Sequence, residues 1–436
     1  MAPGSDSSPS GETRDGATGA DAGPPCLVDG RRWNALYLIA AVAMIFTTLA
    51  VAIQPLFLRK LLGVSLDSAG MINANVEVTA ELLTLGVIGS LGVLSDRLGR
   101  VPILAGGFLV GAAGGFLAPF SFQLGTLLGI GGIAFYYLAR LVMAVGTCAV
   151  WPQLSTLAGD FTGYGDRARR MSNATSMMAF GSALVFAVLM QIPRHTSVVT
   201  VMLFNAVLGL AGAWLVRRFL VDVAPQRLGE AIPWQRVRDL LAREPRLRVA
   251  FAAALFSRSD VAVIGLFYML WTIYFADLVG KSQELAAAHA GTVIGAAGLL
   301  LVITSIGWGV VVERLGRINS VIAGMAVSGT GFALMSAVGN PFDAFVLVPM
   351  TMIALGQAGA LLAPDVLALD ITPKDMRGAI IGALNMVGGI GIILMLELGG
   401  WLFDAVGPYG PFALAGCGNL MVMAYAFAVS QRTRAR

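Results

Sequence analysis

Three polar side chains, Asn73, Glu77 and Glu81, recur at four-residue intervals inside one strongly apolar segment. On a helix this spacing places them on one face. Two ionised carboxylates so arranged repel each other, and a bound proton would relieve the repulsion. Their oxygens, with the amide oxygen of Asn73, also suit Fe²⁺ or Mn²⁺. The segment therefore predicts a proton carrier or a metal site, for which Asp260 is our first candidate as a further ligand.

A lone guanidinium, that of Arg140, lies in another apolar segment. A charge within a membrane span is costly unless it meets a partner or a cavity. A buried guanidinium normally pairs with a carboxylate, and Glu77 or Glu81 is the expected partner. Two interpretations stay open. Arg140 forms a purely structural ion pair, or it binds an anionic substrate or tunes the protonation of a neighbouring carboxylate.

Three more charges interrupt apolar segments in the second half of the chain. Arg258 and Asp260 are two residues apart, so on a helix they point to nearly opposite faces. We expect one of them to contact a cavity and the other to pair between helices. Asp365 follows Pro364 near the end of its segment, where it is either a gate or a boundary charge. These three residues join Glu77, Glu81 and Arg140 as candidate substrate or proton groups.

Composition excludes most classes of soluble protein. Of the 436 residues, 57% are hydrophobic and 12% are charged, whereas soluble proteins carry about 25% charged residues. Mean hydropathy is +0.79. A soluble enzyme, a disordered chain and a fibrous protein are therefore excluded. Glycine supplies 54 residues, which is typical of closely packed membrane helices.

Continuous apolar runs predict an all-α membrane protein rather than a barrel of alternating strands. Twelve runs are long enough to span a bilayer, and a long polar loop separates the first six from the last six. We expect two pseudo-symmetric six-helix bundles. The predicted spans lie near 34–57, 70–94, 101–120, 127–154, 170–192, 198–219, 249–275, 288–311, 318–338, 343–367, 377–402 and 409–429.

The distribution of Lys and Arg predicts that both termini are cytoplasmic in a bacterial inner membrane. With that orientation 23 of the 29 basic residues lie on the cytoplasmic side and four on the other. The net charge of +4 then reflects topology, and no nucleic-acid partner is needed to explain it. The expected organisation is a disordered cytoplasmic tail (1–30), an N-terminal bundle (31–219), a cytoplasmic linker (220–247), a C-terminal bundle (248–430) and a short cytoplasmic tail (431–436).

Part of the linker, from Ile232 to Arg243, mixes apolar and basic residues. It suits either a basic amphipathic helix on the membrane surface or a solvated linker.

A repeat relates the two halves of the chain. The segment from Gly92 to Arg100 matches the segment from Gly309 to Arg317 at a constant offset of 217 residues. Both follow the second span of their half, which marks a duplicated transporter architecture. The repeated residues with candidate roles are Gly92, Asp96, Arg97, Gly99, Arg100, Glu313, Arg314 and Arg317.

With its repeat and the division into six and six spans, the G-x-x-x-D-R-x-G-R segment at 92–100 resembles the major facilitator superfamily over roughly residues 33–430. The resemblance implies alternating access around a cavity lined mainly by spans 1, 4, 7 and 10. It also implies that the repeated motif latches the two halves in one conformation. Asp96 is suited to face the N-terminus of a helix.

Two features narrow the resemblance. Arg140 is followed by Ala144, whereas the drug–proton antiporters of the superfamily have R-x-x-x-G there. The segments Gln54–Arg59, Leu62–Ser65 and Ile72–Glu81 are similar to major-facilitator proteins of bacterial magnetosome membranes. That similarity implies a link to iron supply for magnetite and a magnetosome membrane as an alternative location.

The sequence contains no recognisable catalytic motif. Gly280-Lys281-Ser282 resembles part of a phosphate loop but lacks the first glycine of that motif. We therefore expect no enzyme and no cofactor. The predicted function is proton-coupled secondary transport of a small solute across the lipid bilayer, with a cation favoured and iron a candidate. Efflux of an organic cation or drug, and a non-transporting scaffold or sensor on the same fold, are the alternatives.

Overall fold

The computed structural model describes residues 28–162, 167–223, 234–373 and 376–434. Helices make up the fold, and the described residues include no strand. Twelve helical spans are long and apolar enough to cross a membrane, which confirms the predicted all-α architecture. The expected N-terminal tail up to residue 27 and the linker residues 224–233 lie outside the described residues.

The N-terminal half supplies six spans. The first span breaks at Ile53, just before Pro55, because proline cannot continue the helical hydrogen bonding. The helices are α1 (Gly30–Ala52) with α2 (Gln54–Lys60), α3 (Ala69–Leu98), α4 (Arg100–Leu117) with the short α5 (Ser121–Leu127), α6 (Gly132–Asp160), α7 (Arg167–Ala187) and α8 (Val198–Phe219).

The C-terminal half supplies the other six. Its first span contains a π-helical turn at Ile264–Tyr268, and such turns occur often at functional sites. The helices are α10 (Pro245–Val263) with α11 (Met269–Leu278), α12 (Gln283–Leu315), α13 (Arg317–Met335), α14 (Leu347–Ile371), α15 (Arg377–Ala405) and α16 (Gly410–Arg434).

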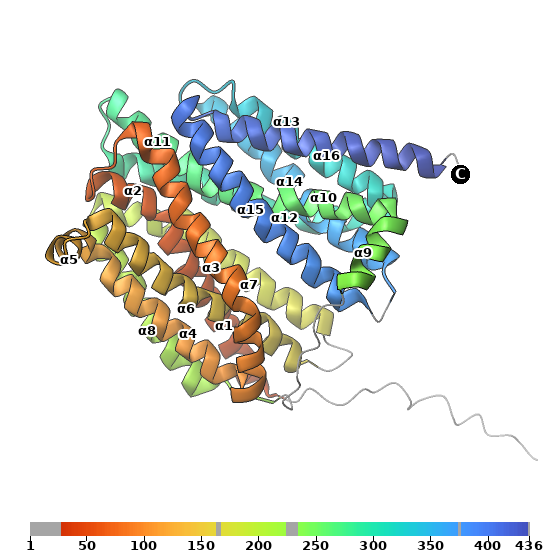
Figure 1. Ribbon diagram of the computed structural model, residues 1–436, viewed down its shortest axis with the longest axis horizontal. Coiled ribbons are helices and arrows are strands. Elements are labelled where there is room, and N and C mark those ends of the chain that lie inside the picture. The colour runs from red at the N-terminus through yellow and green to blue at the C-terminus, as the bar shows by residue number, and fades with distance from the viewer. Residues whose placement is uncertain (1–27, 163–166, 224–233, 374–375, 435–436) are drawn as a thin grey trace, which may run out of the picture.

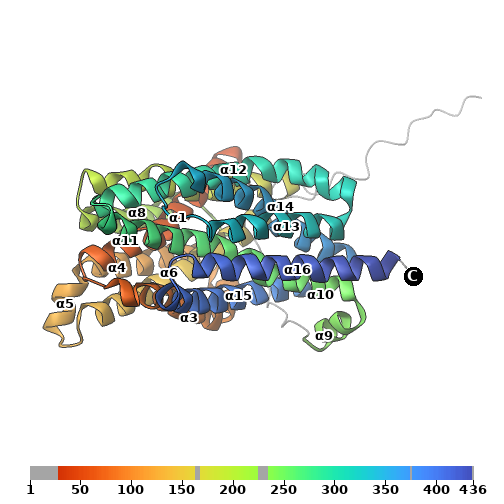
Figure 2. The same cartoon turned by 90° about the horizontal axis from the view of Figure 1, so that it is seen from above.

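Each half packs as one bundle (Figures 1 and 2). Glycines bring its helices close together. In the N-terminal half α4 packs on α6, where Gly111 and Gly146 meet backbone to backbone. In the C-terminal half α13 packs on α14 around Gly324 and Gly356. The most extensive contacts between the halves are those of α3 with α15 and of α7 with α12.

A basic helix follows the long loop between the halves. Helix α9 (Trp234–Arg243) buries Val237 against the C-terminal half and leaves Trp234 exposed. Arg248 donates from Nε to the carbonyl of Leu241 at 2.8 Å and so satisfies the end of the helix. Residues 234–243 thus form a helix, and its place on the membrane surface stays a prediction.

The bundle has two ends. We call the end with α9 and the C-terminal end of α16 the termini face, and the end with α5 and the 60–69, 278–283 and 405–410 connections the opposite face (Figure 1).

At the opposite face, ion pairs hold the two halves together. Arg59 pairs with Asp277 at 2.7 Å and Lys60 pairs with Glu284. The Tyr274 hydroxyl also donates to the carbonyl of Val64 at 2.8 Å.

A carboxylate of the C-terminal half also caps a helix of the N-terminal half. The Asp404 side chain accepts from the backbone nitrogens of Gly70 and Met71 at 2.7 and 2.8 Å. These nitrogens belong to the first turn of α3, whose N-cap residue, Ser68, makes no side-chain cap. An anion at a helix N-terminus is stabilised by the unpaired N–H groups and by the helix dipole.

The halves diverge toward the termini face, as Figure 1 shows. Among the described residues, hydrogen bonds and ion pairs join the halves toward the opposite face. The molecule is therefore in a conformation open toward the termini face.

Removal of the Asp404 carboxylate should loosen the opposite face. A lost helix cap costs about 0.5–2 kcal/mol, so Asp404→Ala should raise the population open at that face by a factor of about 2–30. The measurement is the spin-label distance between cysteines placed at Leu66 and Val406, with Cys26 and Cys417 replaced by serine. Asp343→Ala is the control, because Asp343 bonds only within its own loop segment. Equal distance distributions in both variants would contradict the role of Asp404.

Candidate functional site

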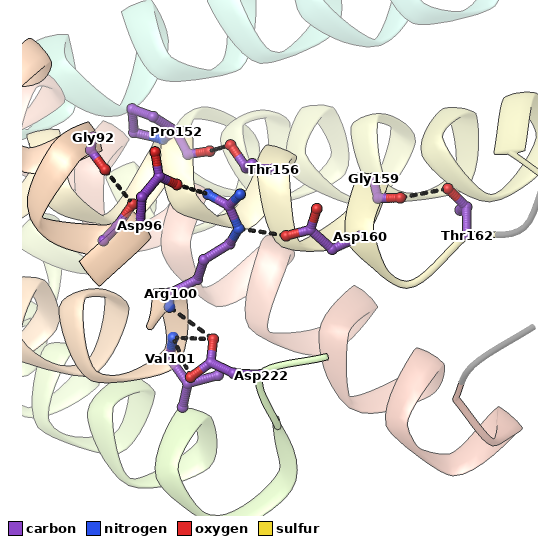
Figure 3. Close-up of polar contacts among 11 residues, drawn as sticks. Gly92, Asp96, Arg100, Val101, Pro152, Thr156, Gly159, Asp160, Thr162 and Asp222 are labelled. Atoms are coloured by element: carbon purple, nitrogen blue, oxygen red, sulfur yellow. Dashed lines mark hydrogen bonds and ion pairs between the residues drawn. The ribbon is translucent and has the colours of Figure 1, made fainter. Parts of the chain in front are cut away.

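The first copy of the repeated motif forms a polar cluster where α3 ends and α4 begins (Figure 3). Arg100 pairs with Asp160 at the end of α6 and lies 3.5 Å from Asp96. Gly99, at a φ of +98°, makes the sharp turn between the helices. These contacts all lie within the N-terminal half.

Asp222, a residue that the sequence did not single out, occupies the N-terminus of α4. Its Oδ1 accepts from the backbone nitrogens of Arg100 and Val101 at 2.7 and 3.1 Å. Asp96 was the residue expected at a helix N-terminus, but in this conformation its recorded ion pair is with Arg100. The sequence signal for Asp222 is that it is an acidic residue just after the sixth span.

The second copy of the motif keeps the main ion pair. Arg317 at the start of α13 pairs with Asp370 at the end of α14 at 2.7 Å, matching Arg100 and Asp160. Glu313 and Arg314 are exposed. Each copy thus ties its own half together, and the latch between halves stays a prediction.

A cavity of about 440 Å³ lies between the two halves. Spans 1, 7 and 10 line it, as the resemblance implied, and spans 2, 5, 8 and 11 line it as well. Span 4 contributes no lining residue; its Arg140 reaches the lining residue Glu77 instead. The lining is largely apolar. Its charged and polar members are Thr47, Thr48, Glu77, Glu81, Ser182, Arg258 and Gln357.

Glu77 and Arg140 form a tight buried pair. Arg140 donates from an Nη nitrogen to Oε1 of Glu77 at 2.5 Å, and the two side chains are 7% and 14% exposed. The expected pairing of Arg140 with a carboxylate of the second span is therefore confirmed. This pair neutralises both charges.

Glu81, one turn further along α3, lines the same cavity without an ion pair among the described residues. Its Oε1 lies against Gly389 of α15. Glu77, one turn before it on α3, and Arg140 on α6 are already paired with each other. When ionised, Glu81 is therefore a charge of the cavity lining that no ion pair among the described residues balances.

Arg258 and Asp260 separate as their spacing predicted. Arg258 lines the cavity and bonds both oxygens of Asp365 at 3.1 and 3.3 Å. Asp260 is fully buried on the other side of α10. There it accepts from Asn419 at 2.8 Å and lies 3.5 Å from Ser328.

These positions correct the predicted metal site. Asp260 is buried within the C-terminal half and supplies no ligand to the cavity. Asn73 is buried as well, donates to the carbonyl of Ala69 at 2.8 Å and does not line the cavity. No group of three or more His, Cys, Asp or Glu side chains suited to a metal occurs among the described residues. Of the predicted ligands, Glu77 and Glu81 line the cavity, and Glu77 is paired there with Arg140.

Comparison with known proteins decides the family. The sequence model of the Major Facilitator Superfamily matches residues 36–280 and 261–436. The chain belongs to this superfamily. It is a membrane transporter by family and fold, and not an enzyme.

Magnetosome proteins are among its relatives. The chain is 50% identical over 402 residues to the magnetosome protein MamH of Paramagnetospirillum magneticum, covering 92% of this chain and 93% of MamH. It is 38% identical to the magnetosome protein MamZ of Magnetospirillum gryphiswaldense, covering 96% of this chain but 64% of MamZ. The resemblance drawn from the first two spans is thereby confirmed.

Solved transporter structures share the fold. The nucleoside transporter NupG superposes with a TM-score of 0.73 at 15% identity, covering 91% of this chain and 98% of NupG. The inward-open xylose transporter XylE from E. coli gives 0.67 at 14% identity, covering 91% and 95%. At this identity the likeness concerns the fold alone.

Loss of the Glu77 carboxylate should destabilise the protein. Glu77→Gln leaves the Arg140 charge buried and uncompensated, which costs about 3–5 kcal/mol, and thermal unfolding in detergent should shift down accordingly. Glu81→Gln is the matched control, one turn away and without an ion pair, and should change little. The double variant Glu77→Gln/Arg140→Met should recover most of the loss. Similar melting of the two single variants would show that the pair does not stabilise the fold.

Proposed function

We propose that this protein is a proton-coupled secondary transporter of a small cation, with Glu81 binding the proton and the cation in turn. The observation that carries the proposal is that Glu81 faces the cavity between the halves with no ion pair among the described residues.

Charge balance favours a cation over an anion. The pairs Glu77–Arg140 and Arg258–Asp365 cancel, so Glu81 leaves the cavity with one net negative charge when ionised. A carboxylate enclosed in the bilayer without a counter-charge is costly. A bound proton or a bound cation would remove that cost, and competition between them would couple their movements.

The open termini face and closed opposite face support alternating access. Opening the opposite face requires separation of Arg59 from Asp277 and of Lys60 from Glu284. The excess of Lys and Arg on the termini face supports a cytoplasmic location for that face. We therefore propose that the observed conformation is open to the cytoplasm, in a bacterial inner membrane or a magnetosome membrane.

Fe²⁺ is the first candidate substrate. The relationship to MamH and MamZ, both named magnetosome proteins, supports it, as does the carboxylate oxygen in the cavity. An organic cation is the second candidate, favoured by the apolar lining that includes Phe186, Ile392 and Leu396. The cavity volume of about 440 Å³ is within the range of small-molecule sites. A cavity with an unpaired charge argues against a scaffold without transport.

Uptake into proteoliposomes tests the proposal. Wild-type protein should take up Fe²⁺, Mn²⁺ or a quaternary ammonium ion in exchange for protons. Uptake should be faster as the pH rises on the side from which the cation enters, because deprotonated Glu81 binds the cation. Glu81→Gln should abolish the pH dependence and reduce uptake at least tenfold, a factor worth about 1.4 kcal/mol.

Glu397→Gln is the control, since Glu397 lies within a span but does not line the cavity. Unchanged pH-dependent uptake by Glu81→Gln would contradict the proposal. Competition assays with the three cations decide between metal and organic substrates.

A further inference from the structure

We propose that Asp260 binds a resident proton and shares it with Asn419, as a carboxylic acid paired with an amide. The proton stays inside the C-terminal half and is distinct from the proton exchanged at Glu81. The inference goes beyond the proposed function, because it concerns a buried site outside the cavity.

The site lies where three helices of the C-terminal half meet. Asp260 is on α10, Ser328 on α13 and Asn419 on α16, and all three side chains are fully buried. A Cβ at Gly329 would lie 3.0 Å from the Cβ of Asn419, so α13 and α16 approach each other closely beside the site. The polar groups here must therefore be satisfied by one another rather than by water.

Two oxygen atoms of the site have no hydrogen-bond partner among the described residues. Asn419 donates from Nδ2 to Oδ2 of Asp260 at 2.8 Å, but the Oδ1 atom of each residue is buried and unpartnered. Burial of an acceptor without a donor is costly. Two acceptors cannot satisfy each other, so the site lacks one donor hydrogen.

A proton on Oδ1 of Asp260 supplies that donor. A protonated carboxyl offers one O–H donor and one acceptor oxygen, and the amide of Asn419 offers N–H donors and one acceptor oxygen. Facing each other, the two groups make two hydrogen bonds in one ring. Because Nδ2 and Oδ2 already meet at 2.8 Å, rotation of the two side-chain ends can bring the Oδ1 atoms together. One proton thus satisfies both unpartnered oxygens.

Charge balance also favours the protonated form. An ionised Asp260 would be a carboxylate enclosed by protein, which requires a counter-charge. No ion pair among the described residues involves Asp260. Arg258, two residues earlier on α10, lies on the cavity side and is paired with Asp365 of α14.

The groups that face Asp260 from the other helices are neutral. Ser328 of α13 and Asn419 of α16 are its polar contacts. On α15, Glu397 lies one turn before Gly400, which packs against α3, so this carboxylate is on the face turned to the N-terminal half. The described residues thus supply no positive charge to the Asp260 carboxylate.

A proton fits this site better than a metal cation. The side-chain oxygens at the site are those of Asp260, Ser328 and Asn419. Ca²⁺ takes about 6–8 oxygen ligands, and Mg²⁺ demands near-octahedral geometry. A shared proton needs only two oxygens, and the site holds two that lack a partner.

The resident proton has a consequence for the cavity. The pair of Asp260 and Asn419 fastens α10 to α16 on the side of α10 away from the cavity. Arg258 points to nearly the opposite side of the same helix. The pair therefore fixes the rotation of α10 and with it the side from which Arg258 meets the cavity. Because the carboxyl is neutral, the C-terminal half can move as a unit without a further buried charge.

Infrared spectroscopy of the full-length protein in nanodiscs tests the proposal. The measurement compares Glu81→Gln, which lacks the cavity carboxyl, with Glu81→Gln/Asp260→Asn. The difference spectrum should contain the carbonyl stretch of one protonated carboxyl at a pH at which exposed carboxyls are ionised. The band should shift only slowly after transfer to D₂O, because the site is buried.

Thermal unfolding in detergent supplies a second readout. Asp260→Asn should melt as the wild type does, because an amide at this position can make the same two hydrogen bonds. Asn419→Leu removes both bonds and should lower the melting temperature by at least about 2 °C. The exchange variant Asp260→Asn/Asn419→Asp again has one acid and one amide. It should regain the stability, and in the Glu81→Gln background it should regain the infrared band.

Absence of the band from folded Glu81→Gln, or a large loss of stability in Asp260→Asn, would overturn the inference. So would a melting temperature that is higher in NaCl than in choline chloride for the wild type but not for Asp260→Asn, because that result would indicate a bound metal cation. Failure of the proposed function would instead appear as unchanged pH-dependent uptake by Glu81→Gln.

Discussion

The 2.5 Å bond between Arg140 and Glu77 reflects the constraint that organises this molecule. A charge enclosed by hydrocarbon needs a counter-charge, because water is absent. By occupying Glu77, Arg140 leaves Glu81 as the cavity carboxylate with no fixed partner among the described residues. The remaining architecture positions this carboxylate between two halves that separate at one face and meet at the other.

Carboxylates remote in the sequence cap the N-termini of two helices, and one of these caps joins the two halves. Asp222 caps α4 within the N-terminal half, while Asp404 of α15 caps α3 across the interface between the halves. The second bond joins the two halves at the closed face, so we expect it to stabilise this conformation rather than the fold of either half. The ion pairs of Arg59 and Lys60 act at the same face.

Much of this was predictable from local pattern. The twelve spans follow from hydropathy, the repeated motif from its offset of 217 residues, and the opposite orientations of Arg258 and Asp260 from helical geometry. The sequence does not predict that Arg140 pairs with Glu77 rather than with Glu81, because both carboxylates share one helical face. It depends on how deeply α6 lies against α3.

Other contacts depend on partners remote in the sequence. Asp260 is 159 residues from Asn419, which holds it away from the cavity, and nothing in its own segment signals this burial. Asp222 and Asp404 lie 122 and 334 residues from backbone groups that they cap. A free helix N-terminus such as that of α3, whose preceding Ser68 makes no cap, is the signal that such a partner exists.

Proton release on cation binding is the most direct measurement of the role given to Glu81. Purified protein in weakly buffered detergent solution, near the pH at which half of the Glu81 carboxyls are protonated, should acidify when a transported cation is added. Glu81→Gln should release no proton on the same addition. Cation binding without proton release by the wild type over the whole pH range, or equal release by the variant, would contradict the assignment of Glu81 as the shared site.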